Sequence, residues 1–249
     1  MQPVSNQTKP TWIFPREHGA WAMLIMPFLL GIAISGHTLY HAFAGIGFFM
    51  GYLAMYAFLG IVRQPRRMRE LLLCFLVYSL GAVCFLLIPF LYKPQAFLPV
   101  LAMVPLLGIS VIFIVKKKER HFGNDLAGIT ALTMLLPIAA SLGQQVQVST
   151  VLLAMGLNIV YFTGSVFYVK SMIRERTNQS FRMIGIAYHV CVLLTALLFQ
   201  STTLLALLFI PSTIKMLSVI RIQQLKPIAV GITEIVNAVW FVVGAFWIL

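Results

Sequence analysis

Residues 71–92 read LLLCFLVYSLGAVCFLLIPFLY, a run of 22 residues without a charged side chain. As a helix rising about 1.5 Å per residue, this run is long enough to cross the hydrocarbon core of a bilayer, which is about 30 Å thick. Its apolar residues occupy every face of that helix, whereas a strand of a membrane barrel alternates apolar and polar residues. The stretch therefore predicts a membrane-spanning helix.

Eight more runs of the chain have the same character. The longest apolar stretch, 183–219, is too long for one span, and the polar tetrad Gln200-Ser201-Thr202-Thr203 is the natural turn inside it. We therefore predict an all-α bundle of nine spanning helices in a single transmembrane domain, residues 20–249, preceded by a cytoplasmic arm, residues 1–19. Besides 71–92, the predicted spans are 20–36, 41–62, 97–115, 124–142, 148–169, 183–200, 202–219 and 228–248.

The composition agrees with a bilayer as the surrounding solvent. Hydrophobic residues make up 60% of the chain and charged residues 10%, whereas a soluble domain carries about 25% charged residues. The net charge of +12 does not indicate a nucleic-acid partner, because nucleic-acid binding needs basic residues gathered on a soluble surface. Here the basic residues lie in the short connectors between apolar runs, so we expect membrane lipid, and no nucleic acid, around the protein.

The basic residues also predict the orientation of the bundle. Positive charge accumulates in the cytoplasmic loops of membrane proteins. Of the 18 Lys and Arg residues, 17 lie before the first span or in every second connector, and Lys93 lies on the other side. The N-terminus is therefore expected in the cytoplasm and the C-terminus outside. The connectors hold Arg63, Arg66, Arg67 and Arg69; Lys116, Lys117, Lys118 and Arg120; Lys170, Arg174, Arg176 and Arg182; and Lys215, Arg221 and Lys226.

Consecutive polar residues at the entry to the first span form one candidate site. Arg16, Glu17 and His18 place a cation, an acid and a titratable ring at the membrane interface. A histidine exchanges protons near neutral pH, and Glu17 could tune it or position a substrate. The other interpretation is an interfacial anchor, in which an ion pair and Trp21 hold the helix at the membrane surface.

Arginine-rich connectors form a second candidate site. Arg63, Arg66 and Arg67 follow the second span, and Arg174 and Arg176 follow the sixth. The planar guanidinium group matches the oxygens of a phosphate or carboxylate, so two facing loops could clamp an anionic head group. Ordinary cytoplasmic charge in contact with anionic lipid is the alternative.

Two residues at the start of the fifth span form a third candidate. Asn124 and Asp125 are suitable N-cap residues, and a carboxylate there suits the helix dipole. If they do not cap the helix, Asp125 is well placed to act as a base or a cation ligand, with His121 one turn away.

Polar residues inside the spans complete the candidates. Glu234 lies six residues into the ninth span, and an ionisable group at membrane depth is a functional candidate by default. Asn237 lies one turn further along the same face. Asn158 and Tyr161 form a similar pair in the sixth span, where a hydrogen bond between helices is the alternative.

No sequence motif indicates a cofactor or a metal. The chain has no G-x-x-x-x-G-K-[ST], G-x-S-x-G or H-E-x-x-H pattern. His37 and His41 have the spacing of metal ligands on a helix, but a zinc site needs at least three protein ligands. We therefore expect no metal and no cofactor.

Two segments resemble a known family. PREHGAWAMLIMPFLLG, residues 15–31, looks like the opening of the YwiC-like bacterial membrane proteins, and YFTGSVFYVKSMIRER, residues 161–176, looks like a later block of the same family. The resemblance implies a multi-pass protein of the bacterial cytoplasmic membrane. It implies no activity, because none is established for that family.

A wider resemblance is to the UbiA prenyltransferase superfamily. FGNDLAGITALTMLLPIAASLG, residues 122–143, loosely resembles the fifth span of those proteins, which have nine spans and active-site loops after spans two and six. That superfamily holds magnesium with two aspartate-rich motifs. The corresponding positions here, 60–65 and 170–175, read GIVRQP and KSMIRE, so the standard magnesium-dependent transfer is not expected.

Three functions are compatible with these observations. The first is binding or modification of an isoprenoid or another anionic-headed lipid at the cytoplasmic mouth of the bundle, which the topology and the arginines favour. The second is a small secondary transporter with Glu234 or Asp125 as its proton or substrate site. The third is a non-catalytic membrane partner of an unknown protein complex. Whether the protein is an enzyme is left open.

Overall fold

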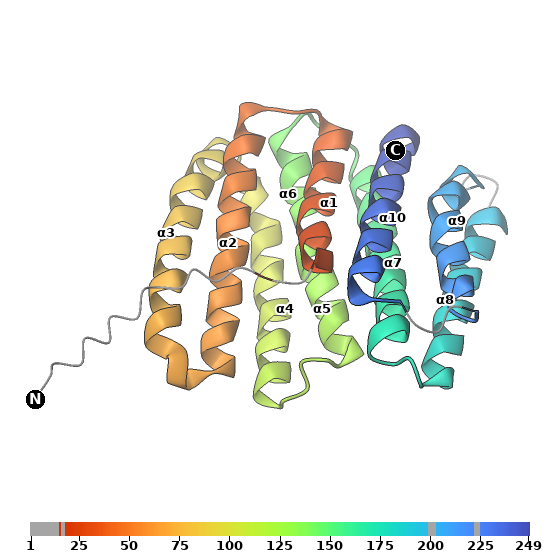
Figure 1. The fold of residues 1–249 in the computed structure, drawn as a ribbon. Helices are drawn as coiled ribbons and strands as arrows, with labels where there is room; N and C mark the ends of the chain where they lie inside the picture. Colours follow the sequence, from red (N-terminus) through yellow and green to blue (C-terminus); the bar gives the residue numbers. More distant parts are fainter. Residues whose placement is uncertain (1–14, 16–17, 199–202, 222–224) are drawn as a thin grey trace, which may run out of the picture.

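The computed structural model describes residues 15, 18–198, 203–221 and 225–249, and within these residues every regular element is helical. The all-α prediction is therefore confirmed. The helices are α1 (His18–Ser35), α2 (Leu39–Arg63), η1 (Pro65–Arg67), α3 (Met68–Tyr92), η2 (Pro94–Phe97), α4 (Leu98–Val115), α5 (Phe122–Thr133), α6 (Leu135–Leu142), α7 (Val148–Ile173), α8 (Gln179–Leu198), α9 (Thr203–Ser218) and α10 (Pro227–Ile248). Figure 1 shows the longer helices running side by side, with the C-terminus at the upper end.

The helices follow the predicted spans closely. Among the described residues, seven helical segments are long and apolar enough to cross a membrane, and Trp21–Ser35 and Leu204–Ser218 are shorter apolar helices. The turn predicted at residues 200–203 falls mostly outside the described residues, between the end of α8 and the start of α9. The count of nine spans stays a prediction.

The fifth predicted span differs from expectation, because two helices replace the single helix predicted for 124–142. α5 begins two residues earlier, at Phe122, and regular helix stops at Met134 before α6 begins. Pro137 explains the break. A proline cannot donate to the carbonyl four residues before it, here that of Thr133, and its ring crowds that group. Pro137 is tolerated in the first turn of α6, where the helix needs no such donor.

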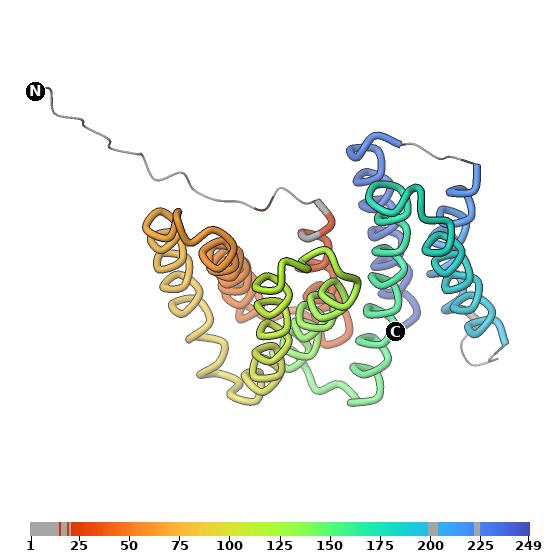
Figure 2. The backbone as a smooth tube through the Cα atoms, turned by 90° about the horizontal axis from the view of Figure 1, so that it is seen from below, coloured from red at the N-terminus to blue at the C-terminus, as the bar shows by residue number. Residues whose placement is uncertain are grey.

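α1 lies at the centre of the bundle. It packs against α6 and α10 and also contacts α2, α5 and α7. Figure 2, seen along the helices, shows α2, α3 and α4 to one side of α1 and α7 to α10 to the other. The first span thus lies between the two halves and contacts both.

The contact between α1 and α6 depends on a glycine. A Cβ atom at Gly31 would lie 2.6 Å from the Cβ atom of Ala139 and would also overlap the carbonyl of Leu136. Leu30 and Leu136 beside this contact are almost completely buried. Where lipid surrounds the helices, such close approach of small residues is a main source of attraction between them.

The outer surface of the bundle is apolar. Leu80, Val83, Leu101 and Val104 on α3 and α4 are exposed by 52% or more, and α8 and α10 carry similar exposed residues. An apolar surface this extensive is unfavourable in water and suits a bilayer. The protein is therefore an integral membrane protein with several spans.

All of the described connectors that are rich in Lys and Arg lie at the same end of the bundle, called the basic end below. It is the lower end in Figure 1, where α2 meets α3, α4 meets α5 and α7 meets α8. Lys93, between α3 and η2, lies at the opposite end. The structure thus brings together the charges that predict a cytoplasmic face.

The replacement Gly31→Ala is expected to destabilise the bundle by about 1–3 kcal/mol, because the added methyl group overpacks the contact with α6. Unfolding of the purified protein by titration with sodium dodecyl sulfate measures the effect. Gly108→Ala is the matched control, since a Cβ atom there meets nothing within 4 Å. Equal stability of the two variants would contradict the assigned role of Gly31.

Candidate functional site

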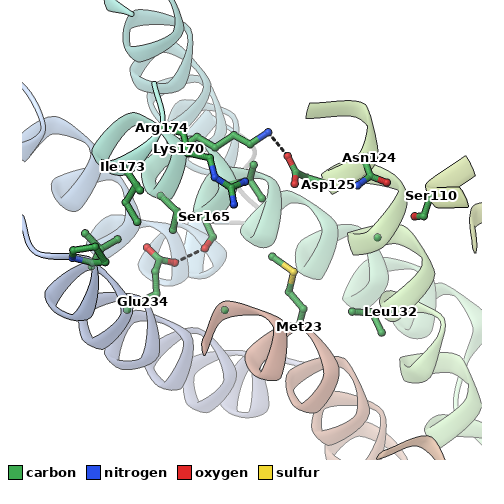
Figure 3. Close-up of a pocket in the computed structure, with 17 residues that line it drawn as sticks. Met23, Ser110, Asn124, Asp125, Leu132, Ser165, Lys170, Ile173, Arg174 and Glu234 are labelled. Atoms are coloured by element: carbon green, nitrogen blue, oxygen red, sulfur yellow. Dashed lines mark hydrogen bonds and ion pairs between the residues drawn. The ribbon is translucent and has the colours of Figure 1, made fainter. Parts of the chain in front are cut away.

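A cavity of about 500 Å³ opens at the basic end of the bundle. Its walls come from the start of α1, from α5, from the last turns of α7 and from the first turns of α10, with Ser110 contributed by α4. Figure 3 shows these side chains converging on one space. The cavity brings together four predicted site residues that are far apart in sequence: Asn124, Asp125, Arg174 and Glu234.

Asp125 lies in the first turn of α5 and forms an ion pair with Lys170 of α7. The Lys170 ammonium group also donates a hydrogen bond of 2.8 Å to the carbonyl of Arg120. The lysine side chain is 8% exposed and that of Asp125 is 24% exposed, so the pair is largely shielded from water. Lys170 thereby ties the connector before α5 to the end of α7.

The prediction that Asn124 or Asp125 caps α5 is wrong. The helix begins at Phe122, and its N-cap is His121, whose Nδ1 atom accepts a hydrogen bond of 3.1 Å from the backbone N–H of Gly123. Both candidates therefore lie inside the first helical turn. A carboxylate there still benefits from the helix dipole.

Glu234 is a buried acid with two partners. One carboxylate oxygen forms an ion pair with Lys215 of α9, and the other accepts a hydrogen bond from the Ser165 hydroxyl of α7. The Lys215 ammonium group also lies 4.5 Å from the ring centroid of Tyr168. Because a buried charge is costly without compensation, this acid and this lysine require each other.

Arg174 and Asn124 line the cavity and have unused capacity for ion pairs or hydrogen bonds. Among the described residues, no acid lies within ion-pair distance of Arg174, an exposed residue that follows the last residue of α7. Asn124 donates a hydrogen bond of 2.8 Å to the carbonyl of Glu119, while its buried Oδ1 atom has no partner in the described part of the chain. In Figure 3 the guanidinium group of Arg174 projects toward the space between the two acids.

The other polar candidates in the spans join helices to each other, outside the cavity lining. Asn158 donates a hydrogen bond of 2.7 Å to Thr133. Asn237 donates to the Tyr161 hydroxyl at 3.1 Å and to the Ser212 hydroxyl at 2.8 Å. These contacts agree with the alternative that such side chains make hydrogen bonds between helices.

The remaining connector arginines do not line the cavity. Arg63 makes a bidentate ion pair with Glu119, and Arg67 pairs with Glu70 one turn away. Arg66 and Arg176 are exposed. Of the two arginine-rich connectors, only the second therefore contributes a side chain to the cavity.

The candidate site before the first span is mostly outside the described residues. This holds for Arg16 and Glu17 and for the side chain of His18, whose backbone begins α1. Gly19, the next residue, lines the cavity. The roles of Arg16, Glu17 and His18 stay predictions.

Three residues of the site are absent from the predicted set. Lys170 and Lys215 count only as connector charges in the sequence, although Lys215 lies inside the predicted span 202–219. The position of Lys215 inside a span is the signal that could have identified it, since a charge within a span needs a partner. Ser165 lies among other small and apolar residues, and nothing in the sequence distinguishes it.

Comparison with known proteins identifies the family. The family described as "YwiC-like protein" matches residues 14–140, which is more than half of the chain. The chain belongs to this family. The predicted resemblance is thereby confirmed, and the match includes Asn124 and Asp125.

Relatives of this YwiC-like protein extend over nearly its whole length. The "Uncharacterized protein YwiC" of Bacillus subtilis is 32% identical over 231 residues, which cover 92% of this chain and 95% of the relative. An "Uncharacterized protein" of Haemophilus influenzae is 28% identical over 233 residues, with coverage of 92% and 96%. No solved structure matches the chain.

The two cavity acids do not form a metal site with other described residues. No group of three His, Cys, Asp or Glu side chains in the described part of the chain could hold a metal ion. Asp125 and Glu234 instead face lysines from α7 and α9. The charged groups of the cavity are therefore arranged as acid–lysine pairs beside Arg174.

The replacement Glu234→Gln is expected to cost about 3–5 kcal/mol of stability, because it leaves the buried Lys215 without its counter-charge. Lys215→Met is expected to cost a similar amount by stranding the acid. Titration with sodium dodecyl sulfate measures both variants. The double variant Glu234→Gln/Lys215→Met is expected to lose less than the two single losses combined. Additive losses would contradict coupling between the two side chains.

Proposed function

We propose that this YwiC-like protein binds an amphiphile with an anionic head group, an isoprenoid or another lipid, in the cavity at the basic end. The observation that carries the proposal is that Arg174 lines the cavity with no acid of the described residues within ion-pair distance, whereas Asp125 and Glu234 are paired with lysines. The chemistry of any reaction there would differ from the magnesium-dependent transfer of the UbiA superfamily.

The charges of the cavity favour an anion. Lys170 neutralises Asp125 and Lys215 neutralises Glu234, so that Arg174 supplies the net positive charge of the described lining residues. A guanidinium group binds phosphate or carboxylate oxygens through two parallel hydrogen bonds.

The remaining walls of the cavity favour an apolar tail. Met23, Leu132, Val166 and Val169 line it from α1, α5 and α7. Pockets of about 300–1,000 Å³ hold compact organic ligands, so a volume of about 500 Å³ fits a head group with part of a chain. Charge at the mouth and apolar walls deeper in the bundle together match an amphiphile.

Native mass spectrometry of the protein released gently from detergent tests the proposal. A co-purifying anionic amphiphile is expected on the unmodified protein. Arg174→Ala is expected to weaken its binding about 10- to 100-fold, because a hydrogen bond to a charged group contributes about 1.5–3 kcal/mol. Arg176→Ala is the matched control, since this exposed arginine lies two residues away and outside the cavity lining.

An adduct that persists unchanged in Arg174→Ala would contradict the proposal. A bare protein mass for the unmodified protein would also remove its support and would favour a secondary transporter. The observation that favours transport is that Glu234 both lines the cavity and pairs with a buried lysine. Uptake in vesicles that is lost in Glu234→Gln would then identify that function.

We further propose that the basic end faces the cytoplasm of a bacterial cell, with the protein in the cytoplasmic membrane. The positive charge of the connectors supports this orientation, and the relatives come from two bacteria. A C-terminal fusion to alkaline phosphatase, which is active only outside the cytoplasm, is expected to be active. An inactive phosphatase fusion, together with a fluorescent C-terminal fusion to green fluorescent protein, would contradict the orientation.

A further inference from the structure

His189 is a buried ring in the interior of the bundle, apart from the cavity lining. It lies ten residues beyond the start of α8, about 15 Å from the basic end of that helix at 1.5 Å per residue. The residue is 4% exposed. An ionisable side chain at this depth is a functional candidate by default.

The hydrogen bonds of the ring leave one nitrogen available. Nδ1 lies 2.8 Å from the carbonyl of Gly185, and because a carbonyl only accepts, Nδ1 carries the ring hydrogen. Nε2 is then an acceptor, and it is buried without a partner among the described residues. The buried His41 differs, since its Nδ1 accepts from the backbone of Thr38 and its Nε2 donates to the carbonyl of Ala139, both at 2.9 Å.

A small cavity lies beside this nitrogen. Its volume is about 10 Å³, and its walls include Tyr161, His189, Ser212 and Thr213. A Cβ atom at Gly164, which also lines it, would lie 2.9 Å from Nε2, so the space depends on that glycine. The wall of this cavity is mostly apolar, and a cavity of about 10–15 Å³ holds one water molecule only if the water has two to four polar partners.

The surrounding groups match the bonding capacity of one water. Asn237 donates one hydrogen to the Tyr161 hydroxyl and one to the Ser212 hydroxyl, so each hydroxyl keeps its own hydrogen to donate. No described acceptor takes either of these hydrogens. The Thr213 hydroxyl donates to the carbonyl of Phe209 at 2.9 Å and keeps its capacity to accept. A water there accepts from Tyr161 or Ser212 and donates to Nε2 of His189.

Polar groups also lie between the small cavity and the cavity at the basic end. Two cross-links join α9 to α10: the ion pair Lys215–Glu234 and the hydrogen bond Ser212–Asn237. They are neighbours, because their residues are three positions apart on each helix. Glu234 lines the cavity, and Ser212 lines the small cavity of His189. Two neighbouring polar cross-links thus lie between the cavity at the basic end and the small cavity of His189.

We infer that one water molecule is bound between α7, α8 and α9, and that it makes His189 a proton-exchange site. The ligand of this site is water, and its proton acceptor is Nε2 of His189. The acidic and basic side chains on the surrounding helices are Tyr161, Tyr168 and Lys170 of α7, Arg182 and Tyr188 of α8, Lys215 of α9 and Glu234 of α10. The inference rests on geometry that is independent of the proposed lipid site.

Solid-state nuclear magnetic resonance of the full chain in lipid bilayers, with ¹⁵N-labelled histidine, tests this inference. Transfer of magnetisation from water to each ring is measured, and His189→Gln assigns the His189 resonances. Fast transfer to His189 is expected, with slow transfer to His41, which is equally buried but bonded to protein at both nitrogens. Transfer to His189 that is no faster than transfer to His41 would overturn the inference.

Gly164→Ala should abolish the fast transfer, because its methyl group occupies the space beside Nε2. The control is Gly156→Ala on the same helix, where a Cβ atom meets nothing within 4 Å. Unchanged His41 resonances show that a variant is folded. Fast transfer that survives in the folded variant would also overturn the inference.

Discussion

A polar group in the hydrocarbon of a bilayer has no water to bond, and the interior of this bundle is organised by that constraint. Glu234 is stable at its depth because Lys215 and Ser165 meet both carboxylate oxygens. Asn158 and Asn237 likewise find hydroxyl partners on neighbouring helices. The helices are therefore joined by specific polar contacts as well as by close packing, and these contacts fix which helices are neighbours.

The same constraint explains where the cavity lies. A charged cavity in the middle of the bilayer would be costly, whereas at the end of the helices the first turns and connectors can supply the counter-charges. Asp125 enters from the first turn of α5, and Lys170 and Arg174 from the last turns of α7. Placing these turns and the start of α1 at one end of the bundle brings together residues up to 215 positions apart, from Gly19 to Glu234.

The spans could be predicted from sequence because hydrophobic length is a direct requirement of the bilayer. The break at Met134 was not predicted, because the effect of Pro137 depends on how its neighbours pack. Of the site, Asp125 and Glu234 stand out as acids in a chain with few acids, and Arg174 as a connector cation. The pairing of Glu234 with Lys215 depends on the packing of α9 against α10, which no local pattern reveals. The sequence shows His189 only as a histidine in an apolar run. Its buried nitrogen and the small cavity beside it become visible only in the structure.

The break at Met134 divides one predicted span into two helices with different contacts. α6 is anchored, because Leu136 and Ala139 lie against Gly31 at the centre of the bundle. α5 carries Asp125, Gly128 and Leu132 into the cavity wall. Met134 between them keeps helical backbone angles, with φ −62° and ψ −16°, and α5 is itself packed against α1, α4 and α7. One predicted span thus supplies a core contact from one helix and part of the cavity wall from the other.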